Sequence, residues 1–160
     1  MLILGLDPGS TRIGYGIIKK EKNDLKLVAS GLLKILSKDK SQRLLEAEKS
    51  LSEILKKYSI DLAALEKLFF MKNLKTAIEV SQTRGVLTLL VVKHKIPLLE
   101  FSPSEVKIAA TGYGSADKRA VAKMIGKILK TDKISKVDDI SDALAIAIAA
   151  ALKVKFISHK

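Results

Sequence analysis

The stretch that decides the fold is Leu2-Ile3-Leu4-Gly5-Leu6-Asp7-Pro8-Gly9-Ser10, near the start of the chain. Its apolar part, from Leu2 to Leu6, predicts a short buried β-strand. Pro8 cannot donate a hydrogen bond to a neighbouring strand and Gly9 favours a tight turn, so the strand ends at this point. Asp7 would therefore carry a carboxyl group at the end of a buried strand.

Two more strands are expected to follow at once. From Ile13 to Lys19, larger side chains alternate with Gly14 and Gly16. Both glycines therefore share one face of the strand, where another element can approach the backbone closely. Leu25 to Ile35 is expected to be the third strand. Short turns between three successive strands predict an antiparallel meander.

After these strands the pattern changes to helices that alternate with strands. Ser41 is the expected N-cap of the first helix. Gly85 lies inside the second helix and suggests close packing there, because glycine costs about 1 kcal/mol relative to alanine in a helix. The expected helices are Ser41–Tyr58, Asn73–Lys95, Ser104–Ala110, Ala116–Lys130 and Asp138–Leu152, and the expected strands are Ile60–Glu66 and Pro97–Phe101.

This order of elements predicts an α/β fold. Three strands followed by helices and strands in alternation give a five-stranded mixed β-sheet with helices on both faces. The chain has 160 residues, of which 48% are hydrophobic. That size and composition are typical of one globular domain. We therefore expect a single domain over residues 1–160, with a short basic tail after about residue 153.

The composition narrows the range of functions. The chain has no cysteine and only two histidines, which excludes disulfides, thiolate metal sites and a histidine-rich zinc site. Its 29 basic and 17 acidic residues give a net charge of +12, which suggests a polyanionic partner. A membrane is disfavoured, because no helix combines a basic face with aromatic anchors and the longest apolar run, Ala143 to Leu152, is too short to span a bilayer. No signal peptide is evident, so we expect a cytoplasmic protein.

Three acidic residues stand in apolar surroundings. Asp7 and Glu66 each follow an apolar run, and Asp142 precedes another. Charged groups rarely take such positions unless they are paired or bind a metal, because desolvation is unfavourable. Asp139 lies three residues before Asp142, so both side chains project from one face of a helix. Asp138 with Asp142 is the alternative pair, and the spacing alone leaves it open.

Converging carboxylates would need cations. Two carboxylates 4 Å apart repel by about 4 kcal/mol at an effective dielectric constant of about 20. Oxygen ligands suit Mg²⁺ or Mn²⁺, and two such ions can hold the attacking water and the leaving oxygen of a phosphodiester. Each acid also has an ordinary explanation, in a turn, beside a lysine or at a helix N-terminus. Taken together, an all-carboxylate site in a basic protein predicts a nuclease.

The chain resembles a known family along almost its whole length. The matching motifs are Ile3-Leu4-Gly5-Leu6-Asp7-Pro8-Gly9-Ser10, Gly14-Tyr15-Gly16, Glu66-Lys67-Leu68-Phe69 with Lys72-Asn73, Gln82-Thr83-Arg84-Gly85-Val86, Val106-Lys107, Thr111-Gly112-Tyr113-Gly114-Ser115-Ala116-Asp117-Lys118 and Asp139-Ile140-Ser141-Asp142-Ala143-Leu144-Ala145-Ile146-Ala147. They occur in the order of the RuvC-type Holliday junction resolvases. That family has the RNase H-like fold.

The resemblance implies a function and roles for individual residues. Asp7, Glu66, Asp139 and Asp142 resemble the four catalytic, metal-binding carboxylates of the family, which hold two Mg²⁺, with Mn²⁺ as a substitute. Lys107, Lys118, Phe69 and Arg84 would contact DNA, with Phe69 stacking on a base. The implied enzyme is a homodimeric endonuclease that nicks two opposed strands of a four-way junction in recombination and repair. It leaves 5′-phosphate and 3′-hydroxyl ends and works with the RuvA–RuvB branch-migration complex.

Three other functions compete with this one. Another RNase H-like nuclease, such as a YqgF-type protein, would act on RNA or on other branched DNA. A junction-binding module without catalysis would explain the net charge but not the four carboxylates. ATP-binding sugar kinases and actin-like proteins also begin with a strand followed by Asp-x-Gly-Ser/Thr, but they need about twice this length.

Overall fold

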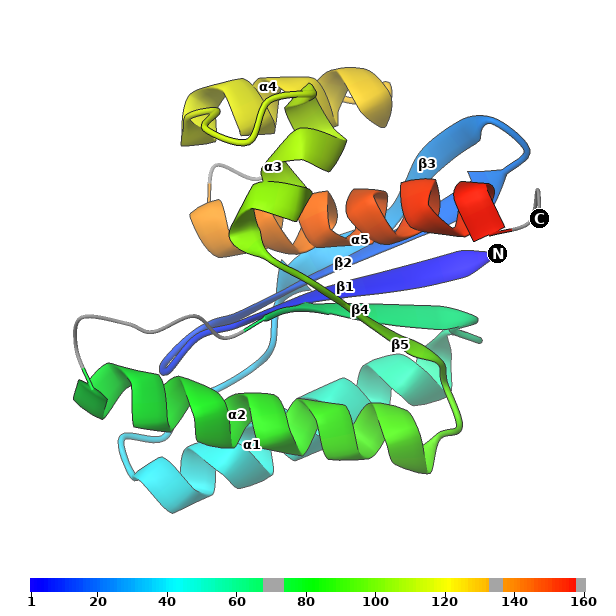
Figure 1. Ribbon diagram of the computed structural model, residues 1–160. Coiled ribbons are helices and arrows are strands. Elements are labelled where there is room, and N and C mark those ends of the chain that lie inside the picture. The colour runs from blue at the N-terminus through cyan, green and yellow to red at the C-terminus, as the bar shows by residue number, and fades with distance from the viewer. Residues whose placement is uncertain (68–73, 133–136, 158–160) are drawn as a thin grey trace.

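Five strands form one mixed sheet at the centre of the molecule. The computed structural model describes residues 1–67, 74–132 and 137–157 (Figure 1). Across the sheet, the strand order is β3-β2-β1-β4-β5. The strands are β1 (Leu2–Pro8), β2 (Ile13–Glu21), β3 (Asp24–Leu32), β4 (Leu62–Glu66) and β5 (Leu98–Phe101).

The apolar strand β1 occupies the middle of the sheet. Its residues Ile3, Leu4 and Leu6 are completely buried, because helices cover both faces of the sheet at this strand. β1 pairs antiparallel with β2 and parallel with β4. β2 in turn pairs antiparallel with β3, which completes the predicted meander. The predicted five-stranded mixed sheet is confirmed.

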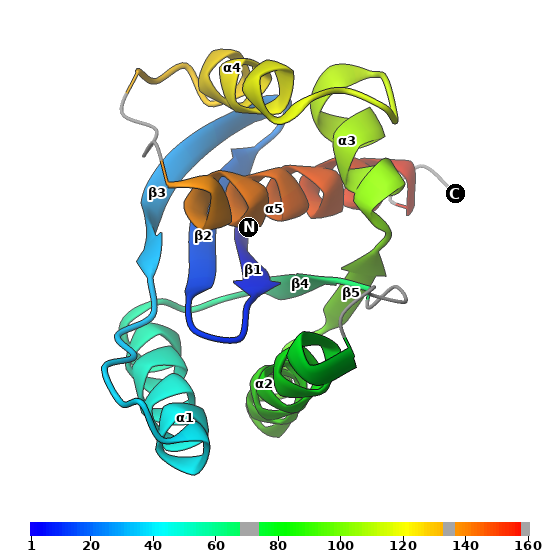
Figure 2. The same cartoon turned by 90° about the vertical axis from the view of Figure 1, so that its left-hand side faces the viewer.

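Helices cover both faces of the sheet, as predicted. Figures 1 and 2 show α1 and α2 on one face and α3 and α5 on the other. α4 forms an outer layer and packs on α3 and α5. Two hydrophobic clusters, one on each face, make up the core. The helices are α1 (Lys40–Lys57), α2 (Leu74–Lys93), α3 (Pro103–Thr111), α4 (Lys118–Ile128) and α5 (Asp138–Ile157).

Three helices begin at side-chain caps. α1 is capped by Asp39, whose carboxylate accepts a hydrogen bond from the backbone N–H of Gln42 at 2.8 Å. The expectation that Ser41 is this cap is therefore wrong, because a stronger acceptor two residues earlier starts the helix. Ser102 and Glu105 form a reciprocal capping box at α3, and Asp117 caps α4.

Several boundaries differ from those predicted. β3 ends at Leu32, three residues before the expected Ile35, and α4 begins at Lys118, two residues after the expected start. α5 continues to Ile157, past residue 153, where the sequence predicts the start of a basic tail. Short-range patterns locate these elements, but hydrogen bonds to caps and neighbouring strands set their ends.

Two glycines allow α5 to lie directly on the sheet. A Cβ added to Gly5 would stand 2.1 Å from the backbone oxygen of Ala143, and one added to Gly14 would stand 1.9 Å from that of Asp139. The close approach predicted at Gly14 is thus confirmed. The prediction of close packing at Gly85 is wrong for contacts within the described residues. A Cβ placed there would have no atom within 4 Å beyond its neighbours and the nearby backbone of its own helix. Among the described helices, none is long and apolar enough to cross a membrane.

Candidate active site

Two acidic residues meet where neighbouring parallel strands end. Leu6 of β1 pairs with Leu65 of β4, and the next residue on each strand is an acid, Asp7 or Glu66. Residues at the same level of adjacent parallel strands lie about 5 Å apart, so both carboxyl groups come to one edge of the sheet. This is the position that the apolar runs in the sequence predict for them.

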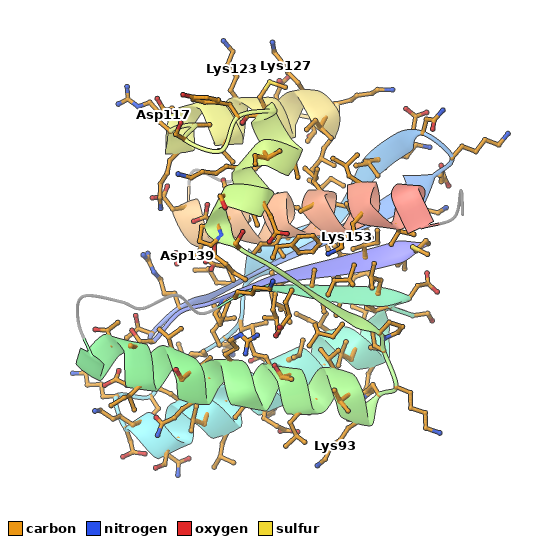
Figure 3. The ribbon with its side chains drawn as sticks, viewed as in Figure 1. Lys93, Asp117, Lys123, Lys127, Asp139 and Lys153 are labelled. Atoms are coloured by element: carbon orange, nitrogen blue, oxygen red, sulfur yellow. The ribbon has the colours of Figure 1, made fainter. Side chains whose placement is uncertain are left out.

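The start of α5 brings two further acids to this edge. Gly14 pairs with Asp7 across β1 and β2, and its missing side chain lets the backbone of Asp139 come close to the sheet. Asp142 follows one turn later. Figure 3 shows Asp139 at the N-terminal end of α5, on the side of the molecule where β1 ends. Asp7, Glu66, Asp139 and Asp142 are called the acidic cluster from here on.

Burial and mutual repulsion disfavour the ionised forms of the carboxyl groups in the acidic cluster. The pKa of Asp7 is raised from 3.8 to about 7, first by burial and then by the negative charges of Asp142, Glu66 and Asp139. Burial also raises the pKa of Glu66 and of Asp142. Like charges at short range disfavour ionisation in this way. The charges of the other three acids therefore all reach Asp7.

The structure distinguishes Asp139 from Asp138. The Asp139 side chain is 21% exposed and its charge raises the pKa of Asp7, whereas the Asp138 side chain is 67% exposed and its charge raises the pKa of Asp142. Asp138 instead accepts a hydrogen bond from Lys118 at 3.3 Å. Asp139 therefore occupies the position that the three-residue step to Asp142 predicts.

Lys118 reaches the acidic cluster from the first residue of α4. Its Nζ lies 3.3 Å from an oxygen of Asp138 and 3.6 Å from one of Asp142. The negative charge of Asp142 is the main cause that raises the pKa of Lys118. Lys107, on α3, lines a cavity together with Glu66, Asp142 and Lys118. The structure thus brings both predicted lysines to the predicted carboxylates.

Arg12 is a site residue that the sequence reasoning missed. It lies in the turn between β1 and β2, and its Nε is 3.3 Å from Oδ2 of Asp139. The signal was available in principle, because a tight hairpin after Asp7 returns the chain to the same edge of the sheet. One arginine in a short polar turn does not stand out in a chain with 29 basic residues.

The other two predicted DNA contacts have different outcomes. Arg84, on α2, pairs with Glu100 and donates a hydrogen bond from Nε to the backbone oxygen of Glu66 at 3.3 Å. Its side chain is 19% exposed, so in this structure it holds the end of β4 in place. A DNA contact by Arg84 stays a prediction. Phe69 lies outside the described residues.

The acidic cluster has the chemistry of a site for a hard divalent cation. All four side chains offer carboxylate oxygens, and the buried Oδ2 of Asp139 accepts no hydrogen bond, although it forms an ion pair with Arg12. In the described ranges, however, no three acidic or histidine side chains are grouped so that they could hold one ion as they stand. The positive charge beside the acids comes from Lys118 and Arg12. The donor set fits magnesium.

Comparison with known proteins identifies a matching family. The model of the family described as Crossover junction endodeoxyribonuclease RuvC matches residues 3–150. Proteins of that name from Thermosipho melanesiensis and Alkaliphilus metalliredigens are 41% and 43% identical to this chain. The alignments cover 98% and 94% of this chain and 100% and 93% of the relatives.

A solved structure extends the likeness to three dimensions. It is described as T. thermophilus RuvC in complex with Holliday junction substrate, and it superposes with a TM-score of 0.91 at 26% identity. The superposition covers 99% of this chain and 97% of the other, which confirms the RNase H-like fold. The family match, the identities of the relatives and this superposition all extend over nearly the full length of the chain. The chain therefore belongs to the RuvC family of crossover junction endodeoxyribonucleases.

Proposed function

We propose that this chain is a Holliday junction resolvase. It would hydrolyse phosphodiesters in two opposed strands of a four-way DNA junction, leaving 5′-phosphate and 3′-hydroxyl ends, during recombination and repair. The observation that carries the proposal is the acidic cluster beside Lys107 and Lys118 in a protein of net charge +12. The names of its relatives, and the related structure described as bound to a Holliday junction, support the same activity.

The acidic cluster would hold two divalent cations, with magnesium as the natural ion and manganese as a substitute. When bound, such ions would activate the attacking water and stabilise the leaving 3′ oxygen. The two lysines have a separate task, which is to attract and orient the phosphate. Lys118 now pairs with Asp142 at 3.6 Å, so a phosphate that binds Lys118 would release this carboxylate. Arg12 would steady Asp139.

Two residues outside the cluster would complete the site. Phe69 would stack on a base at the opened junction, where stacking is typically worth about 1–3 kcal/mol. Arg84 would contact DNA or, through its hydrogen bond to the backbone of Glu66, position that carboxylate. Substitution of Arg84 by Lys keeps the charge but cannot reproduce both contacts, so it separates the two roles.

We also propose that the active form is a homodimer, in which two copies of the site act on opposed strands. α2 presents Ile78, Leu89 and Val92, which are 60%, 55% and 58% exposed. Helical spacing places them on one face with Gly85. A Cβ added to Gly85 would have no described atom within 4 Å beyond its neighbours and the nearby backbone of α2. A glycine in an exposed apolar stripe lets a second copy come close. The RuvA–RuvB complex is the proposed cellular partner.

The test is cleavage of a labelled four-way junction in Mg²⁺ and in EDTA, beside a linear duplex and an RNA–DNA hybrid. We expect paired, symmetric nicks in the junction alone, and only with the metal. Asp7→Asn should abolish cleavage while junction binding is kept. Glu53→Gln, which removes an exposed acid on α1, is the matched control and should cut normally.

Each remaining outcome points to another function. Tight junction binding without cleavage in any metal would favour a non-catalytic module. Cleavage of the RNA–DNA hybrid in preference to the junction would retain the carboxylate chemistry but replace the substrate. Normal activity of the Asp7→Asn variant would remove the site assignment itself.

A further inference from the structure

The outer helix α4 carries a row of unpaired positive charges that the proposed catalytic site does not use. Its eleven residues include four cations and no acid. Lys118 belongs to the site described above. Arg119, Lys123 and Lys127 are exposed, and none of them forms an ion pair with any part of the chain that the structure describes. They are called the α4 basic stripe from here on.

The α4 basic stripe runs along one side of the helix, away from the acidic cluster. Its members are four residues apart, so they fall within a narrow arc of the helix surface. The eight helical steps from Arg119 to Lys127 span about 12 Å. Figure 3 shows Lys123 and Lys127 projecting from the outer surface of the molecule. The row begins beside Lys118, whose side chain reaches the acidic cluster.

Small residues beside the stripe leave the helix surface accessible. Ala122 and Gly126 line a shallow depression, and its other lining residues are Lys123, Lys127, Lys130, Thr131 and the acidic Asp132. Lys130 pairs with Asp24 at 2.8 Å, whereas Lys123 and Lys127 form no ion pair within residues 1–67, 74–132 and 137–157. A phosphate backbone lying in the depression would meet Lys123 and Lys127 across the small side of the helix, with Asp132 as the one acid among the lining residues.

The opposite side of α4 restricts what the stripe can bind. Val121, Ile125 and Leu129 are buried against the rest of the protein, so α4 has no apolar face left to insert into a lipid surface. Basic residues on another helix, in contrast, form ion pairs with acidic residues. On α1, for example, Lys40 and Arg43 both pair with Glu79 of α2. The unpaired cations of α4 fit a regularly spaced polyanion.

We propose that the α4 basic stripe binds the sugar–phosphate backbone of a duplex arm of the junction. The inference rests on the proposed function and adds a second contact area to it. A length of about 12 Å corresponds to three or four base pairs of B-form DNA, at about 3.4 Å per phosphate along each strand. Lys118 would hold the scissile phosphate, and the stripe would follow the duplex outward from it.

The test compares two triple variants with the same change in charge. Arg119→Gln/Lys123→Gln/Lys127→Gln removes the stripe, and Lys49→Gln/Lys56→Gln/Lys57→Gln removes three exposed lysines on α1, across the sheet. Junction affinity is measured as a function of salt concentration in Ca²⁺. Three lost phosphate contacts should reduce the slope of log K against log salt by about 2.7, and the α1 variant should keep the wild-type slope.

Two further measurements define the contact. A stripe variant with Arg119→Lys, Lys123→Arg and Lys127→Arg keeps the charges and should restore the wild-type slope. Neutral methylphosphonates placed three to six nucleotides from the cut should weaken binding of the wild type but not of the Gln variant. If both Gln variants give the same slope of log K against log salt while the wild type still cuts junctions, the inference about the stripe is overturned and the proposed function stands. A wild type that neither binds nor cuts junctions would overturn the proposed function together with it.

Discussion

Replacing Asp7 with asparagine should stabilise the metal-free protein, although it removes a carboxylate that we propose is catalytic. The pKa of Asp7 is raised from 3.8 to about 7, so the folded state holds this proton more tightly than the unfolded state does. The free energy of unfolding of the wild type therefore falls as the pH rises between these two values. Asparagine resembles the protonated acid in shape and has no proton to lose.

The size of the effect follows from the same pKa. One pH unit corresponds to about 1.4 kcal/mol, so the Asp7→Asn variant should gain about 2 kcal/mol at pH 5 and about 4 kcal/mol at pH 8. These are upper limits, since salt screens the repulsion between carboxylates. Below pH 4 the two proteins should be equally stable.

Urea unfolding in EDTA, at pH 5 to 8 and constant ionic strength, measures this difference. Asp24→Asn is a control of opposite sign, because Lys130 lowers the pKa of Asp24 and its replacement should not stabilise the protein at any of these pH values. Adding Mg²⁺ at pH 8 should stabilise the wild type more than the Asp7→Asn variant, since an ion that binds only the folded state adds to its stability. The reasoning is refuted if the Asp7→Asn variant is no more stable than the wild type at pH 8 in EDTA.

Three other substitutions test separate parts of the structure. Gly14→Ala would force a Cβ against the backbone oxygen of Asp139 and should cost about 3 kcal/mol in urea unfolding, whereas an unchanged midpoint would contradict the close packing of α5. Ser102→Ala removes the capping box of α3 and should cost about 1 kcal/mol in the same assay, with Ser102→Thr losing much less. Leu89→Asp should give monomers in sedimentation velocity while the circular dichroism spectrum stays native, and a surviving dimer would exclude α2 as the interface.

Much of the acidic cluster could be predicted because its positions are marked locally. Asp7 and Glu66 each follow a buried apolar strand, and parallel pairing of these strands brings both acids to one edge. The three-residue step between Asp139 and Asp142 also points to one helical face. Asp138 could not be set aside from spacing, since only the packing of α5 on the sheet shows which of the neighbouring acids is turned inward.

What could not be predicted depends on contacts between distant parts of the chain. Arg12 becomes a site residue only because the hairpin returns it to Asp139. Gly85 carries the same signal as Gly14, a glycine inside a regular element, yet only Gly14 has a neighbour within the chain. A glycine inside a helix or strand suggests that another element packs closely against it. The sequence does not say whether that element belongs to the same molecule.

The acidic cluster and the basic surface have opposite effects on substrate binding. The net charge of +12 attracts DNA, but four carboxylates at the site repel the phosphate that must enter it. Lys118 reduces this repulsion by pairing with Asp142, where its positive charge opposes the rise of the Asp142 pKa that burial causes. A phosphate that takes Lys118 away leaves the carboxylates without this counter-charge, which raises their affinity for divalent cations. Binding of DNA and of metal should therefore each strengthen the other by the same factor. Replacement of Lys118 by methionine would weaken that coupling, which is measurable as the Mg²⁺ dependence of junction affinity in the cleavage-deficient Asp7→Asn background.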